Sequence, residues 1–186
     1  MRDRMPQLPT AVLTPAQQEA VAAISAGPRG ALFGPFVPLL RSPGAMVRLQ
    51  EVGAYLRFGS GLPKAVLELA ILQVARGRNQ AFEWGYHCPL ALDAGVPRDV
   101  VADVAAGREP LSMQEPLATG YAIVAHVLAD DAIPDELYDR AIDLLGEEGL
   151  IDLVVCAGYY TTLAMVMNAT GTDADALDPP IEMSAS

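Results

Sequence analysis

The chain has 186 residues, of which 52% are hydrophobic and only 19% charged, and its formal net charge is −11. This length suits one well-buried domain and is short for two. The scarcity of basic residues argues against nucleic acid or an anionic membrane surface as a partner, because phosphate groups are bound by clusters of Lys and Arg.

One subunit of this size cannot easily bury so much apolar surface. We therefore expect a homo-oligomer: a dimer, trimer or hexamer. The first residues lack the apolar stretch of a secretory signal, and Cys88 and Cys156 lack the density of a disulfide framework, so a cytoplasmic location with reduced thiols is expected. The nearly uncharged segment 153–169 contains Tyr159 and Asn168 and favours a buried helix over a membrane span.

In chain order, residues 1–12 are interrupted by proline and predict an extended N-terminal arm. Capping residues and helical spacing of apolar residues predict helices over about 15–25, 43–59, 64–76, 81–94, 97–106, 116–128, 134–145 and 148–168. Segment 30–38 is apolar but too rich in Gly and Pro for regular structure. No run alternates as strands do, so residues 13–171 are expected to form one all-α helical bundle, followed by a flexible acidic tail over 172–186.

Three ionisable residues stand out against this apolar background. Glu83 and His87 are four residues apart on a predicted helix and therefore lie on one face of it. Glu68 lies on the preceding apolar helix, where an unpaired carboxylate would be costly, so we expect it to pair with His87, Arg76 or Arg78. Carboxylates and an imidazole in a dry recess are suited to moving protons.

Two other interpretations remain open. A Glu–His pair four residues apart also occurs for purely structural reasons and stabilises an exposed helix by only about 0.2–0.5 kcal/mol. In that case the chain would be a non-catalytic helical oligomer whose Glu–His cluster neutralises a buried charge. A metal site is not expected, because one His and two Glu form a poor zinc set.

The arrangement of these residues resembles the carboxymuconolactone decarboxylase and alkylhydroperoxidase D-like family. The resemblance rests on Leu62-Pro63, the helix bearing Glu68, and the Glu-Trp-x-x-His pattern that ends at His87, and it covers roughly residues 60–110. It implies an all-α helical bundle of the alkylhydroperoxidase D-like type, with Glu68, Glu83 and His87 as catalytic residues.

The peroxidase branch of this family uses Cys-x-x-Cys-x-x-x-His, and alignment on His87 puts Gln80 and Glu83 at the two cysteine positions. Cys88 is out of register, so a thiol-type hydroperoxide reductase is disfavoured. The decarboxylase branch carries Glu-Trp-x-x-His, as this chain does. That branch implies a carboxy-lyase, acting by proton transfer on a small organic acid or a lactone similar to 4-carboxymuconolactone.

A negatively charged substrate also needs a cationic anchor. We predict that Arg41 or Arg76 binds the substrate, since arginine is suited to bidentate carboxylate binding, and that Trp84 and Tyr86 line the site. No cofactor is expected, because no Gly-rich phosphate loop follows a strand. Isomerisation, cyclisation and elimination could use the same proton relay.

Overall fold

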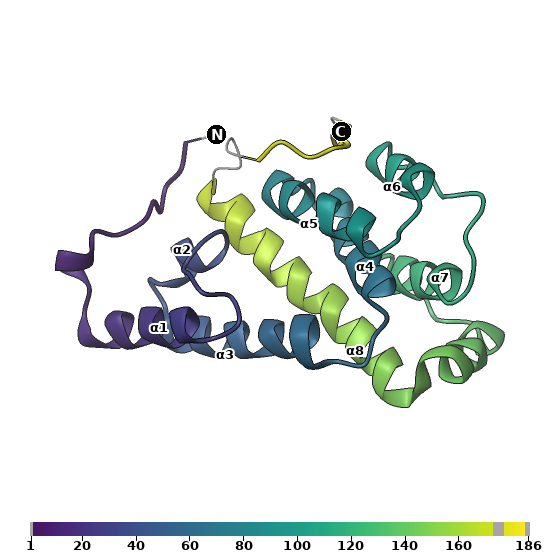
Figure 1. Cartoon of the computed structure of the whole chain (residues 1–186), viewed down its shortest axis with the longest axis horizontal. Helices are drawn as coiled ribbons and strands as arrows, with labels where there is room; N and C mark the ends of the chain where they lie inside the picture. The colour runs from purple at the N-terminus through teal and green to yellow at the C-terminus, as the bar shows by residue number, and fades with distance from the viewer. Residues whose placement is uncertain (1, 173–176, 185–186) are drawn as a thin grey trace.

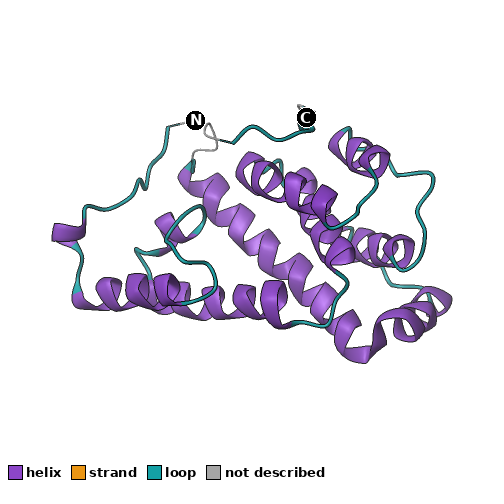
Figure 2. Ribbon diagram, viewed as in Figure 1, coloured by secondary structure: helices purple, strands orange, loops and turns teal. Residues whose placement is uncertain are grey.

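The computed structural model describes residues 2–172 and 177–184, and within them it contains helices and no strand (Figure 2). The elements in chain order are η1 (Thr10–Val12), α1 (Pro15–Ala26), α2 (Phe36–Leu39), α3 (Pro43–Ala54), η2 (Tyr55–Gly59), α4 (Lys64–Gly77), α5 (Ala81–Asp93), α6 (Arg98–Ala105), α7 (Leu117–Leu128) and α8 (Asp135–Thr170). The all-α prediction is confirmed.

Helix α4 lies at the centre of the molecule. Every residue from Val66 to Ala75 is buried, because α4 packs against α5, α7 and α8 on different sides. Figure 1 shows α8 running diagonally beside α4, while α1 and α3 lie side by side along the lower left of the view. A carboxylate on α4, such as Glu68, is therefore forced to find its partners inside the bundle.

The predictions for two N-terminal segments are wrong in detail. Segment 30–38 was expected to be irregular, but Phe36–Leu39 forms the short helix α2. Pro38 fits there because the N–H groups of a first turn have no partner within the helix. The helix expected over 43–59 changes at Tyr55 into the π-helical turn η2, a feature often found at functional sites.

The long element α8 consists of two helical parts. Gly146 has φ of 72° and ψ of 169°, which interrupts the helix between the two segments expected from the sequence. By length and composition alone α8 could cross a membrane, but just over half of its most apolar part is buried, as in the core helix of a soluble protein. Ile151, Val155 and Met165 are exposed along one face of it, and the expected homo-oligomer stays a prediction.

The C-terminal segment, expected to be a flexible tail from residue 172, makes ordered contacts over its described residues 177–184. Trp84 Nε1 donates to the Ile181 carbonyl at 2.8 Å, and Ser184 N donates to the Ala105 carbonyl at 3.1 Å. This segment therefore packs on α5 and α6; residues 173–176 and 185–186 lie outside the described part of the chain. The N-terminal arm is fixed where Arg4 N donates to the Thr170 carbonyl at 2.8 Å.

Candidate active site

Glu68 and His87 meet at the contact between α4 and α5. The short turn 78–80 joins the two helices and folds them against each other, and the Gln80 side chain caps α5 by accepting from Phe82 N. His87 Nδ1 lies 2.6 Å from Glu68 Oε2, so the protonated nitrogen donates a short hydrogen bond to the carboxylate.

Glu83 approaches the other side of the same imidazole. It lies one turn before His87 on α5, and its Oε2 is 3.4 Å from His87 Nε2. Glu68, Glu83 and His87 are only 6%, 3% and 2% exposed. The structure thus brings the three residues together in a water-poor place, with one acid on each imidazole nitrogen.

The two carboxyl groups differ in their surroundings. Burial raises the pKa of Glu83, and the charges of His87, Arg29 and Arg57 offset this effect only in part. Its Oε1 has no hydrogen-bond partner among the described residues. Burial therefore favours the protonated form of Glu83, whereas Glu68 is hydrogen-bonded to His87.

Aromatic rings and an arginine enclose the imidazole. The rings of Tyr86 and Tyr160 stand edge-on to His87 with centroid distances of 5.1 Å each. The Arg57 guanidinium, carried by η2, lies 5.3 Å from the centre of the Tyr86 ring. Burial alone would lower the pKa of Arg57, but the oxygens of Tyr160, Tyr86 and Glu68 raise it overall, so its charge is retained.

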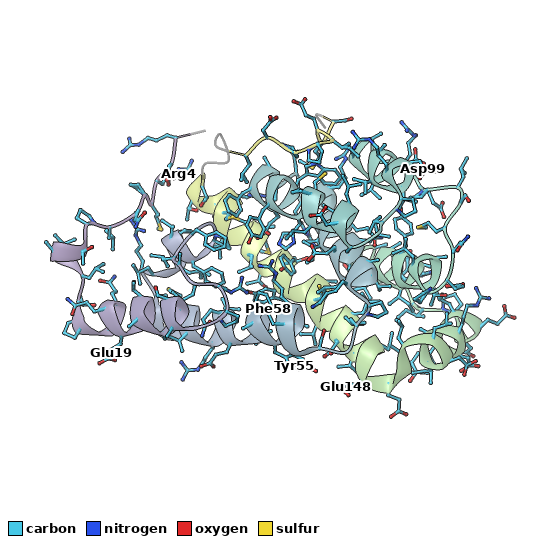
Figure 3. All side chains as sticks on the ribbon, in the orientation of Figure 1. Arg4, Glu19, Tyr55, Phe58, Asp99 and Glu148 are labelled. Carbon is cyan, nitrogen blue, oxygen red and sulfur yellow. The ribbon has the colours of Figure 1, made fainter. Side chains whose placement is uncertain are left out.

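Two hollows adjoin the Glu68–His87 pair, an inner cavity lined by His87 and an outer hollow lined by Glu68. The inner cavity is lined by Arg29, Phe33, Pro35, Phe36, Arg57, Phe82, Glu83, Tyr86, His87, Tyr160 and Leu163, and its volume is about 20 Å³. This volume holds a group the size of a water molecule. The outer hollow, of about 440 Å³, is lined by Arg57, Phe58, Lys64, Glu68, Leu90, Asp93 and Ala94. Phe58, labelled in Figure 3, is half exposed there.

Of the residues predicted to bind substrate, Tyr86 alone lines either hollow. Trp84 is one residue beyond Glu83, about 100° around the helix, and bonds to the C-terminal segment instead. Arg41 donates to the carbonyls of Val37 and Pro6, while Arg76 Nε donates to the Ala105 carbonyl at 3.1 Å. The predictions for Arg41, Arg76 and Trp84 are therefore not supported.

The arginines at the inner cavity are Arg29 and Arg57, neither of which was predicted as a site residue. A signal for each existed in the sequence. Arg29 directly precedes the apolar segment 30–38, and Arg57 lies between Leu56 and Phe58. Charged residues beside or within apolar runs are rarely buried without a partner, so both positions indicated a partly buried arginine, although not which site it would reach.

No group of three or more His, Cys, Asp or Glu side chains in the described part of the chain is arranged to hold a metal ion. The imidazole nitrogens of His87 face different carboxylates on opposite sides, so the three groups do not converge on one point. Their geometry suits hydrogen bonding and proton transfer.

Neither cysteine is arranged as a peroxide-reactive thiol. Both are buried; Cys88 Sγ donates to the Ile181 carbonyl at 3.7 Å, and burial raises the pKa of both thiols. A thiol must ionise to attack, so neither is activated.

We therefore expect both thiols of the folded protein to react with iodoacetamide at least about 100-fold more slowly than free cysteine near neutral pH. Mass spectrometry of the alkylated protein measures this rate, and urea-unfolded protein provides the fully reactive control. Rapid alkylation of Cys88, together with peroxide consumption lost in Cys88→Ala, would instead support a peroxidase.

The fold and site together define an all-α protein with a buried acid–histidine cluster between two neighbouring helices. Residues 43–125 match the family model of the carboxymuconolactone decarboxylase family. This match confirms, over that segment, the resemblance seen in the sequence. No curated protein and no solved structure matches the chain. The matched segment contains Glu68, Glu83 and His87 but not Arg29 or Tyr160.

Proposed function

We propose that the protein is a cofactor-independent, decarboxylase-type enzyme that delivers a proton to a small organic acid or lactone. The observation that carries this proposal is the buried imidazole of His87, held between two carboxyl groups and facing the inner cavity. The match of residues 43–125 to the carboxymuconolactone decarboxylase family supports the reaction class.

The two acids have different roles in this mechanism. Glu68 accepts from Nδ1 and so fixes the tautomer and the orientation of the ring. Nε2 and Glu83 line the inner cavity and share the proton that is transferred. The raised pKa of Glu83 favours keeping that proton within the site at neutral pH.

In the chemical step, the bond between the substrate carbon and its carboxylate breaks and carbon dioxide leaves. The bonding electron pair stays on the carbon and is delocalised into an adjoining carbonyl group or double bond. The proton from His87 Nε2 or Glu83 then forms the new C–H bond. General acid catalysis of this kind contributes about 10²–10⁴-fold to a rate.

The proton must then be replaced at the atom that lost it, His87 Nε2 or Glu83. Nδ1 keeps its own proton throughout, because it donates that proton to Glu68 Oε2. Both proton-donating groups line the inner cavity, so the new proton reaches them from solvent after the product has left that cavity. While the substrate is bound, exclusion of water protects the reacting carbanion.

Substrate entry requires the wall of the inner cavity to move, because its present volume is smaller than an organic acid. The segment around Gly34 is the part of this wall contributed by the N-terminal region. Gly34 has φ of 56°, and a Cβ there would lie 2.4 Å from the Phe82 ring, so only glycine allows this close contact. We infer that segment 30–36 shifts when substrate binds.

The function is tested by incubating the protein in D₂O with 4-carboxymuconolactone and related unsaturated or keto acids. We expect carbon dioxide release and one deuterium at the carbon that loses the carboxylate. Deuterium exchange without carbon dioxide release would indicate isomerisation, cyclisation or elimination at the same relay. Absence of both reactions across the series would count against the proposal.

A further inference from the structure

The outward face of α8 carries a regular row of uncharged side chains after Gly146. Its members are exposed and recur at alternating intervals of four and three residues: Ile151, Val155, Gly158, Thr162, Met165 and Ala169. This row is called the α8 seam below. A repeat of about 3.5 residues keeps the same row of side chains facing a partner helix, as in coiled coils. The seam is about 27 Å long, because an α-helix rises about 1.5 Å per residue.

The two faces of α8 differ in what covers them. On the inner face, Tyr160 and Leu163 line the inner cavity. On the seam, a Cβ built on Gly158 would meet no neighbouring element within 4 Å in the described part of the chain. Glycine destabilises the interior of a helix relative to alanine, and packing within the subunit gives no reason for it here. Close approach of a second helix backbone does give one.

The seam is neutral although the chain has a formal net charge of −11. The only charged residue in segment 151–169 is Asp152, which is buried. The hydroxyl of Thr162 donates to the Gly158 carbonyl at 3.0 Å, so this polar group is satisfied within the helix. Two copies of an acidic chain repel each other where their charged surfaces meet. The seam is a surface at which a second copy can approach without that repulsion.

The seam is complementary to itself when the second copy runs in the opposite direction. Its positions are symmetric about the level of residue 160. A two-fold axis at that level opposes three pairs: Ile151 with the partner's Ala169, Val155 with the partner's Met165, and Gly158 with the partner's Thr162. Each pair joins a larger side chain with a smaller one, as close packing of two helices requires.

The charges at the two ends of the seam favour the same direction. Glu147 and Glu148 are exposed just before the seam begins. Arg4 is exposed at its far end, where the guanidinium donates to the Ala169 carbonyl at 2.8 Å. Figure 3 labels Glu148 and Arg4 near opposite ends of α8. Antiparallel pairing places the acids of one copy beside the arginine of the other, whereas parallel pairing brings the acids together.

The geometry points to a two-fold symmetric dimer in which the α8 seam packs antiparallel against the α8 seam of a second copy of this chain. A contact of this kind uses the same surface on both subunits. The inference gives the expected homo-oligomer a surface, a direction and a register, and it does not depend on the proposed reaction. A hexamer can contain three such contacts, whereas a cyclic trimer has no two-fold axis.

The surface is tested by sedimentation velocity at micromolar protein concentration. We expect the wild-type protein to be a dimer or a hexamer. Val155→Glu and Met165→Glu each place a charge at the contact, so each should weaken association at least about 100-fold while circular dichroism stays unchanged. Leu111→Glu is the matched control, because Leu111 is a fully exposed leucine outside α8. Its association should stay within about twofold of wild type.

The direction is tested by mixing Val155→Cys protein with Met165→Cys protein under mild oxidation. We expect disulfide-linked dimers in the mixture and few in either variant alone. Antiparallel pairing sets residue 155 opposite residue 165 of the partner and about 15 Å along the axis from the partner's residue 155, too far for a disulfide.

Four results would overturn the dimer. They are a monomeric wild-type protein, a cyclic trimer, association retained in both glutamate variants, and disulfides formed as readily in each cysteine variant alone. The last result would indicate parallel pairing. A membrane is the competing occupant of the seam, and vesicles of phosphatidylcholine test for it. Sedimentation of monomeric wild-type protein with these vesicles, lost in Val155→Glu, would assign the seam to a lipid surface instead.

Discussion

Replacement of His87 by glutamine is expected to reduce turnover by about 10²–10⁴-fold while the helical fold is retained. Glutamine matches the size of the imidazole and can still donate to the Glu68 carboxylate, which lies 2.6 Å from Nδ1 in the native protein. It cannot take up and release a proton near neutral pH. The loss should therefore appear in kcat, because the proton is transferred in the chemical step.

Carbon dioxide release and deuterium incorporation measure the catalytic effect, and circular dichroism with sedimentation measures the fold and the assembly. His126→Gln is the matched control, since His126 is the other histidine of the chain and does not line either hollow. A different result would favour a structural Glu–His cluster in a non-catalytic oligomer: the wild-type protein shows no activity, and His87→Gln loses its assembly.

The positions of Glu68, Glu83 and His87 could be predicted because they depend on local geometry. Spacing of four residues places Glu83 and His87 on one helical face whatever the tertiary structure is. A short turn after α4 forces α5 back along it, which brings a lone acid on α4 close to an imidazole on α5. These steps use helix geometry and the cost of an unpaired buried charge.

The two arginines that line the inner cavity, Arg29 and Arg57, could not be selected in the same way. Arg29 reaches the cavity only because the loop after α1 meets α2 at Phe36 and meets α3 and α8 at Gly53, which is a long-range arrangement. Arg57 is carried by a π-helical turn, and periodicity of an ordinary α-helix cannot reveal such a change. Arg41 was equally plausible in sequence, but its guanidinium bonds to backbone carbonyls.

The ordered C-terminal segment also escaped prediction, since its composition is that of a disordered tail. Its contacts include a hydrogen bond from Trp84 to the Ile181 carbonyl and one from Arg98 to the Pro180 carbonyl. Both bonds end on backbone oxygens, which carry no sequence signal. The same contact explains why Trp84, expected at the substrate site, lies on another face of α5.

Replacement of Glu83 by glutamine should make the protein less active and more stable. Burial raises the pKa of the Glu83 carboxyl, so the folded state binds a proton more tightly than the unfolded state does. The folded protein loses stability as pH rises from the ordinary glutamate pKa through the raised value. In this range the unfolded chain releases its proton, whereas the folded protein must either keep the proton or bury a charged carboxylate. Glutamine has the same shape and no ionisation, so the variant escapes this loss.

The difference in melting temperature between Glu83→Gln and wild type should therefore be near zero in acid, grow as pH rises through this window, and level off above it. We expect a gain of a few degrees at neutral pH, since about 1 kcal/mol corresponds to roughly 2–4 °C in a protein of this size. Thermal unfolding across pH measures it. Glu19→Gln, at the exposed glutamate on α1 labelled in Figure 3, is the control and should show no such dependence.

Turnover of Glu83→Gln should fall by about 100-fold or more, because glutamine cannot share the transferred proton with His87 Nε2. A variant that gains stability and loses activity indicates that the native residue serves catalysis and destabilises the fold. A structural Glu–His pair predicts the reverse: Glu83→Gln would lower the melting temperature at neutral pH by removing an ion pair. The sign of the shift therefore distinguishes a proton-transfer site from a packing cluster even before the substrate is known.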